Sequence, residues 1–137
     1  MTQRSWMLTA LVCGLSLGCG GPSGPEKVTV RGTVTLNGEA LESGVINFIP
    51  QTGKGASSGA AIEKGRYAAE ITFGMKRVEI QSPRVIGRKA AYDTPDSPMM
   101  DILEERIPPQ YNALSDLSAE VSAQQTTFDF PLKAAVK

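Results

Sequence analysis

The chain has 137 residues, and its 14 Lys and Arg balance its 14 Asp and Glu, so the formal net charge is zero. A balanced chain lacks the basic field that nucleic acid attracts, so we expect no nucleic-acid partner. The sequence contains no His, which excludes Ser-His-Asp and Cys-His catalysis and removes the commonest metal ligand. We therefore expect no catalytic residue, no cofactor and no metal site.

The first 18 residues have the organisation of a secretory signal peptide. Arg4 supplies a positive charge, and the run from Ser5 to Gly18 is uncharged and mostly apolar. This run is too short for a comfortable membrane span, which needs ~20 apolar residues. After Cys19, residues 20–26 are rich in Gly and Pro and are typical of a flexible tether.

The sequence Leu15-Ser16-Leu17-Gly18-Cys19 resembles the lipobox of bacterial lipoproteins. The resemblance implies that Cys19 receives a diacylglycerol and becomes the new N-terminus. Ser16 departs from the commonest lipobox, which has Leu three residues before the Cys. Cys13 is a poorer lipidation site because Val12 precedes it and the apolar run continues past it. We expect a signal peptide over 1–18, a lipidated Cys with its tether over 19–26 and one domain over 27–134.

This reading predicts an exported protein that a lipid anchor holds on the cell envelope. The two acyl chains of a diacylglycerol suffice for stable membrane attachment. Gly20 follows the Cys, where in diderm bacteria an Asp commonly signals retention in the inner membrane. In a diderm cell the sequence therefore favours the outer membrane.

Residues 28–36 show the strict alternation of a half-buried β-strand, with Val or Leu at even positions and polar residues at odd ones, except at Gly32. We expect Gly32 to mark a bulge or the close approach of another backbone. Asn37-Gly38 is a strong turn signal. Residues 45–49 are apolar on both faces and predict a central strand.

Similar alternation recurs around Tyr67, Val78, Leu117 and Phe128. Glu63 to Arg66 reads as a turn, and Pro131 suggests an edge strand. About seven short strands separated by turn signals predict an all-β sandwich. The alternation places four side chains in its core: Val34, Phe48, Ile80 and Phe130.

Residues 82–112 form a long Pro-rich connection between strands. Within it, Met99 to Arg106 is interpreted as a short helix that starts at Pro98, with Asp96 or Ser97 as its cap. Two roles are open for the apolar residues of this connection, which either contact a protein partner or cap one open end of the sandwich: Met99, Met100, Ile102 and Leu103. We expect Tyr111-Asn112 to pack the connection onto the sandwich.

The same connection carries five carboxylates: Asp93, Asp96, Asp101, Glu104 and Glu105. Calcium binds carboxylate oxygens, so a calcium site is one interpretation. The spacing matches no EF-hand, and nearby Arg88, Lys89 and Arg106 provide partners for the charges. We prefer a solvated loop.

Several motifs resemble carboxypeptidase-regulatory-like domains. The opening Val30-x-Gly32-x-Val34 with Asn37-Gly38-Glu39-Ala40-Leu41, the turn Lys64-Gly65-Arg66-Tyr67 and the strand after Gly74 are similar to theirs. The segment Ile107-Pro108-Pro109-Gln110-Tyr111-Asn112 is similar to the tail of small bacterial lipoproteins carrying this domain. The resemblance implies a seven-stranded, transthyretin-like (prealbumin-like) Greek-key β-sandwich over about residues 28–132.

These features together favour a non-catalytic envelope lipoprotein that displays a binding or structural module. Its partner would be an envelope protein or a glycan, in addition to the membrane. One alternative is an accessory subunit of a transport or secretion assembly. Another is a hydrolase that uses no His, although the hydrolase known on the transthyretin-like fold relies on His.

The anchor is tested by the substitution Cys19→Ser in the full chain. We expect this variant to leave the membrane fraction or to accumulate as an uncut precursor, because the acyl chains have no other attachment site. Fractionation and mass spectrometry of the N-terminus check this. An unmodified N-terminus at another residue of the parent protein would contradict it.

Overall fold

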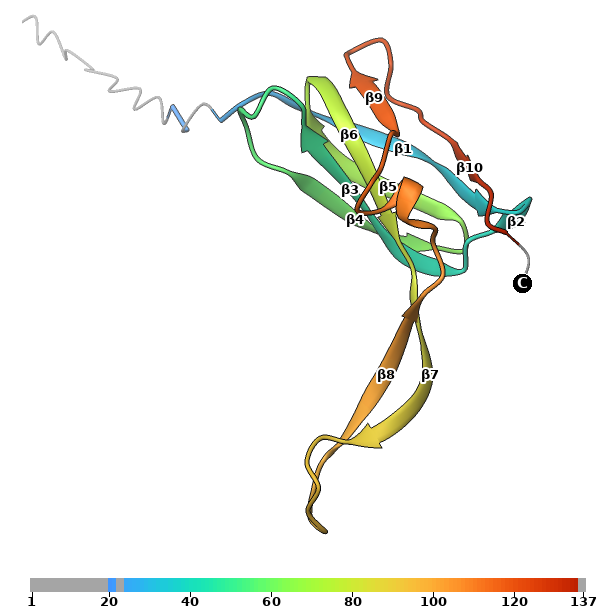
Figure 1. Cartoon of the computed structure of the whole chain (residues 1–137). Coiled ribbons are helices and arrows are strands. Elements are labelled where there is room, and N and C mark those ends of the chain that lie inside the picture. The colour runs from blue at the N-terminus through green and yellow to red at the C-terminus, as the bar shows by residue number, and fades with distance from the viewer. Residues whose placement is uncertain (1–19, 22–23, 136–137) are drawn as a thin grey trace, which may run out of the picture.

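The structure is a computed structural model that describes residues 20–21 and 24–135; the predicted signal peptide and Cys19 lie outside this part. Within it the chain is all-β, with one short 3-10 turn, η1, and no α-helix (Figure 1). The strands are β1 (Lys27–Leu36), β2 (Glu39–Ala40), β3 (Ser43–Pro50), β4 (Ser58–Glu63), β5 (Arg66–Thr72), β6 (Gly74–Gln81), β7 (Pro83–Ala90), β8 (Met99–Glu105), β9 (Ser118–Val121) and β10 (Phe130–Leu132), and η1 spans Pro109–Tyr111.

The main sheet has the strand order β10-β1-β5-β4-β3-β6-β9, and the short β2 pairs with β1. Its neighbours are antiparallel except β1 and β10, which run parallel. Strands β4 and β5 share one paired position, Glu63 with Arg66, so the sheet folds over between them. Two layers result, β10-β1-β5 and β4-β3-β6-β9, in a sandwich-like arrangement.

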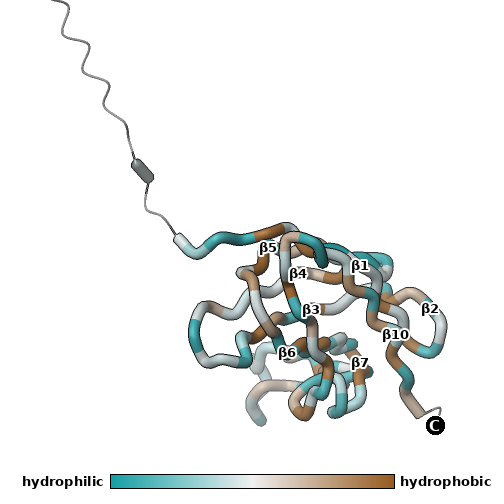
Figure 2. The backbone as a smooth tube through the Cα atoms, turned by 90° about the horizontal axis from the view of Figure 1, so that it is seen from above, coloured by the Kyte–Doolittle hydropathy of each residue, from teal (hydrophilic) through white to brown (hydrophobic). Residues whose placement is uncertain are grey.

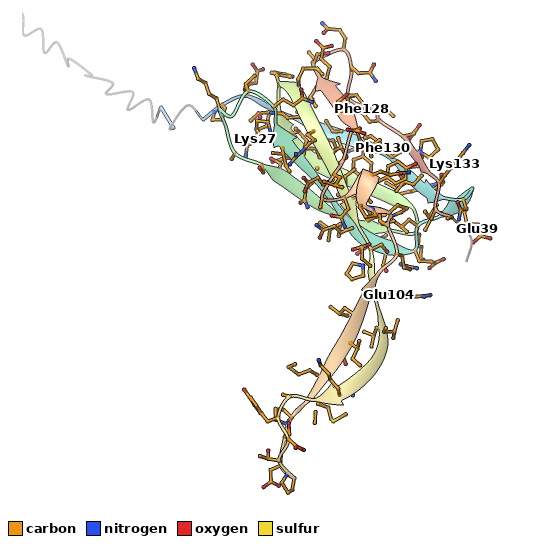
Figure 3. All side chains as sticks on the ribbon, in the orientation of Figure 1. Lys27, Glu39, Glu104, Phe128, Phe130 and Lys133 are labelled. Atoms are coloured by element: carbon orange, nitrogen blue, oxygen red, sulfur yellow. The ribbon has the colours of Figure 1, made fainter. Side chains whose placement is uncertain are left out.

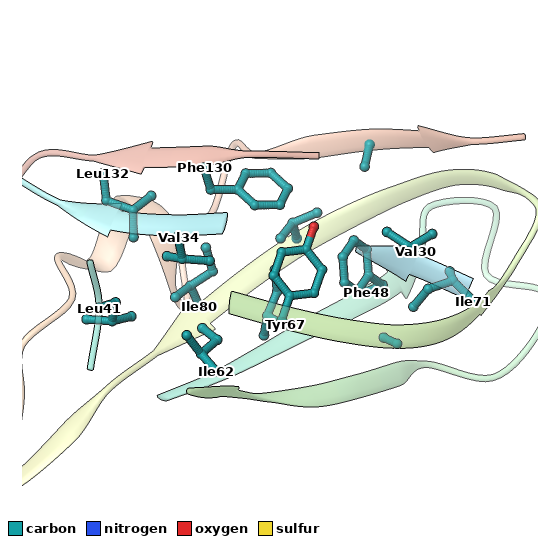
Figure 4. Packing of buried hydrophobic residues seen from close by; sticks show 14 of the residues in the cluster. Val30, Val34, Leu41, Phe48, Ile62, Tyr67, Ile71, Ile80, Phe130 and Leu132 are labelled. Atoms are coloured by element: carbon teal, nitrogen blue, oxygen red, sulfur yellow. The ribbon is translucent and has the colours of Figure 1, made fainter. Parts of the chain in front are cut away.

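The alternation predicted from the sequence is confirmed in the core between these layers. Val34, Phe48 and Ile80 are fully buried, and Phe130 is nearly so. The ring of Tyr67 lies between Phe48 and Phe130, with centroid distances of 5.9 and 6.3 Å (Figure 4). These aromatic contacts join β3 of one layer to β5 and β10 of the other.

Two turns and one glycine confirm further predictions. Asn37 and Gly38 have φ of 53° and 85°, and Lys64 and Gly65 have φ of 51° and 76°, as two-residue hairpin turns with positive φ require. At Gly32 an added Cβ would collide with the backbone oxygen of Phe128, so the expected close approach is real. The Tyr67 hydroxyl donates to the same oxygen at 2.7 Å.

Other predictions from the sequence also hold. Strand β3 lies between β4 and β6, so it is central, and Pro131 lies in β10 at the edge of the sheet. Tyr111 packs against the buried core cluster. The connection 82–112 is therefore attached to the sandwich at its C-terminal end.

The helix predicted over Met99 to Arg106 is wrong. Residues 99–105 form strand β8, which pairs antiparallel with β7 from Pro83↔Glu105 to Ala90↔Met99. Met, Leu and Glu are good helix formers, but a short segment has weak intrinsic helicity. Pairing with β7 gives the backbone of β8 its hydrogen bonds as a strand.

Candidate functional site

Strands β7 and β8 form a two-stranded ribbon that pairs with no strand of the main sheet. We call residues 83–105 the arm. It projects from one end of the sandwich, and its side chains stand clear of the sandwich for most of its length (Figures 1 and 3). Hydrophobic colour appears at β7 as well as on the strands of the sandwich (Figure 2).

The strand register places four apolar side chains on one face of the arm. Val85 pairs with Leu103 and Ala90 with Met99, while a bulge at Ile86 separates Val85 from Gly87. Paired positions share a face, and positions two apart along β8 share the same one. Val85, Leu103, Ala90 and Met99 therefore share one face, with the Arg88–Asp101 pair between them, and we call it the apolar face of the arm.

The apolar face is open to solvent. Val85, Met99 and Leu103 are 55%, 59% and 60% exposed, and the bulge residue Ile86 is 56% exposed. These values exclude the alternative in which this segment caps an open end of the sandwich. On the opposite face of the arm, Ile102 packs over Gly87 and is half-buried, while Met100 is 48% exposed.

The charges of the arm divide between its strands. β7 carries only basic charges and β8 only acidic ones. Cross-strand ion pairs join Arg88 to Asp101 at 2.8 Å and Arg84 to Glu104 at 2.6 Å. The predicted pairing of Arg88 is thus confirmed. In the described part of the chain no three His, Cys, Asp or Glu residues gather as a metal site would require, so the calcium interpretation gains no support.

A network of polar contacts, which we call the root, attaches the arm to the sandwich. Ser82 is fully buried, and its hydroxyl donates to the backbone oxygen of Ser43 in β3. The Glu105 carboxylate accepts the backbone N–H groups of Ser82 at 2.7 Å and Ile107 at 2.9 Å. Arg106 donates from Nε to the Ser82 carbonyl at 3.2 Å and from Nη2 to the Ser82 hydroxyl. Arg106 therefore binds Ser82 at the root. The acidic residues Asp101 and Glu104 of the arm pair with Arg88 and Arg84 instead.

Two open depressions, of about 300 and 510 Å³, adjoin the root. They share Glu105, Arg106 and Ala135, and the larger one also has Lys133 in its lining. A third, of about 440 Å³, lies beside Pro50 and Arg77. None of the three brings together a nucleophile, a base and a buried polar group, as an enzyme site would require.

Lys76 on β6 is the one charged residue that is buried within the described part of the chain. Its side chain is 3% exposed, and Nζ donates to the Thr72 hydroxyl at 2.8 Å. Burial lowers the pKa of Lys76 below its ordinary value. A buried lysine with a lowered pKa is a typical functional group, but Lys76 lines none of the depressions described above. We interpret Lys76 as a structural residue whose hydrogen-bonded ammonium group ends the apolar core.

Searches of protein-family models, curated proteins and solved structures give no match to this chain. Among the residues that the structure describes, no helix is long and apolar enough to cross a bilayer. The arm is therefore the candidate functional site on its own physical features. The sequence pointed to Met99, Met100, Ile102 and Leu103 but missed Val85 and Ile86, whose alternation the bulge interrupts.

The burial of Lys76 predicts how stability depends on pH. In the unfolded chain Lys76 has its ordinary pKa, and in the folded chain the pKa is lower. Between these two values the unfolded state binds more protons, so stability rises with pH across that window. Lys76→Met removes this rise and raises the melting temperature at neutral pH, because it replaces a buried charge by an apolar chain of similar shape.

Thermal melts of the parent and the variant at several pH values check this prediction. Lys27→Met, at an exposed position of β1, is the matched control and should change the melting curve little. A melting temperature of Lys76→Met below that of the parent would show that the ammonium group stabilises the fold.

Proposed function

We propose that this chain is an exported envelope lipoprotein whose sandwich displays the arm as a contact surface for protein. The observation that carries the proposal is the exposed apolar face. Soluble proteins rarely expose contiguous large apolar side chains, and such patches mark interaction sites. Here Val85, Met99 and Leu103 lie on one exposed ribbon face, on either side of the Arg88–Asp101 pair.

The construction of the arm supports the same proposal. Binding residues commonly lie on segments that a rigid scaffold holds in position. Ser82 and Arg106, at the two ends of the arm, both donate to the Ser43 carbonyl of β3, and the sandwich beneath has its own closed core. The arm thus adds exposed apolar area without contributing to that core, which is the opposite of what stability alone would favour.

The lipid anchor completes the proposed role. Residues 19–26 span at most about 28 Å when extended, so the tether would keep the domain close to the membrane surface. We also infer that the sandwich is transthyretin-like. Seven strands along the main path, arranged as layers of three and four, are compatible with that fold and with the motifs around Gly32 and Lys64-Gly65.

Shortening the arm tests this function. In the full chain, residues 85–103 are replaced by Asn-Gly, which keeps the Arg84–Glu104 pair and the root. We expect the melting temperature to stay within a few degrees of the parent, because exposed side chains contribute little to stability. Chemical cross-linking in intact membranes should yield protein adducts with the parent and lose them with the shortened chain.

A double substitution gives a finer control. Val85→Ser with Leu103→Ser removes apolar area from the apolar face, and Phe73→Ser removes an exposed aromatic residue of the sandwich. The first variant should lose the adducts and the second should keep them. A shortened chain that melts well below the parent, or that keeps every adduct, would refute the role of the arm.

A further inference from the structure

An isolated two-stranded ribbon is marginally stable in water unless another surface covers it. We propose that the apolar face of the arm packs against the same face of a second copy of this chain, and that the two copies form a two-fold dimer on the membrane. This inference rests on the proposed function and names the partner. It follows from how the charges are placed on the arm.

The apolar face is self-complementary. At its centre lie Arg88 of β7 and Asp101 of β8, flanked by Val85 with Leu103 on one side and by Met99 with Ala90 on the other. A two-fold axis parallel to the strands places β7 of one arm over β8 of the other. Arg88 of each copy then meets Asp101 of the other, and apolar side chains meet apolar side chains. A two-fold interface pairs residues reciprocally in this way.

The other orientation is unfavourable. A two-fold axis across the strands would place β7 over β7 and β8 over β8. At the centre of the apolar face the charged residues are Arg88 of β7 and Asp101 of β8, so Arg88 would meet Arg88 and Asp101 would meet Asp101. Like charges brought together in an interface oppose association. Charge therefore selects the arrangement in which both arms point the same way and both sandwiches lie at the same end, as two anchors in one membrane require.

The size of the contact predicts a weak dimer. A ribbon of eight residues is roughly 26 Å long and 10 Å wide, or about 260 Å² per face, against the ~800 Å² per partner of a stable interface. We expect a monomer in dilute solution and a dimer on the membrane, where the shared anchor surface raises the effective concentration.

Cross-linking of the full chain in intact membranes tests the dimer. Met99→Cys places a thiol on the apolar face, and a bismaleimide joins two such thiols. We expect a product of twice the chain mass, roughly tenfold more abundant than with Glu70→Cys, an exposed position on β5, because a contact worth ~1.4 kcal/mol changes occupancy tenfold. The parent chain without an added Cys gives the background.

Charge exchange identifies the partner as a second copy. In the Met99→Cys background, Arg88→Asp makes the centre of the apolar face wholly acidic, and Asp101→Arg makes it wholly basic. Each variant alone should lose the dimer because like charges meet, and co-expression of the two, with distinguishable tags, should restore a mixed dimer. The exposed Arg88–Asp101 pair adds little to folding, so both variants should keep the parent melting temperature.

Three results would overturn the inference. The first is that the Met99→Cys dimer is no more abundant than the Glu70→Cys dimer. The second is that the charge variants cross-link as the parent does. The third is that the main product has the mass of this chain plus a different protein. The last result would leave the contact role of the arm intact and reject only the second copy. Loss of all arm-dependent adducts would reject both.

Discussion

The structure depends on how the chain leaves the interior of the sandwich at the end of β6. Ser82 is fully buried at this exit, and a buried polar group without a partner costs ~1–3 kcal/mol. The Ser82 N–H, carbonyl and hydroxyl all find partners, in Glu105, Arg106 and Ser43. Two of these partners, Glu105 and Arg106, come from the segment where the chain returns to the sandwich. The segments that leave and re-enter the sandwich therefore satisfy each other's hydrogen-bonding groups. This reciprocal contact allows an insertion of more than twenty residues to start and end at one place, beside Ser43 of β3.

The root separates the sandwich, whose buried core stabilises the fold, from the arm, whose exposed side chains are proposed to contact a partner. The sandwich holds its apolar side chains inside, around Phe48, Tyr67 and Phe130. Burial, together with the negative charge of Asp129, raises the pKa of Tyr67 well above its ordinary range, so its hydroxyl stays a donor to Phe128 even in alkaline solution. The arm places its apolar side chains outside and balances its charges across the ribbon. Stability and the proposed contact therefore rest on different residues.

Sequence reasoning succeeded where local pattern and burial agree. The alternation around Val34 and Phe130 identified core positions, and Gly32 indicated the crossing of a second backbone. It failed for Met99 to Arg106, because residues that favour a helix lie there in a strand and the partner strand is interrupted by Ile86. The parallel pairing of β1 with β10 is a contact between the two ends of the domain that no local pattern encodes. The predicted site residue Cys19 lies outside the described residues, and the apolar face of the arm emerged only from the register of β7 and β8.

The central claim is that the arm is attached only at its root and folds apart from the sandwich. Amide hydrogen exchange of the full chain in detergent micelles tests this most directly, because the detergent separates the copies. The account predicts that amides of β7 and β8 beyond Arg84 exchange roughly a hundredfold faster, or more, than those of β1, β3 and β6, with the change in protection at Ser82. Equal protection of the arm and the sandwich, with exchange only through global unfolding, would contradict the account.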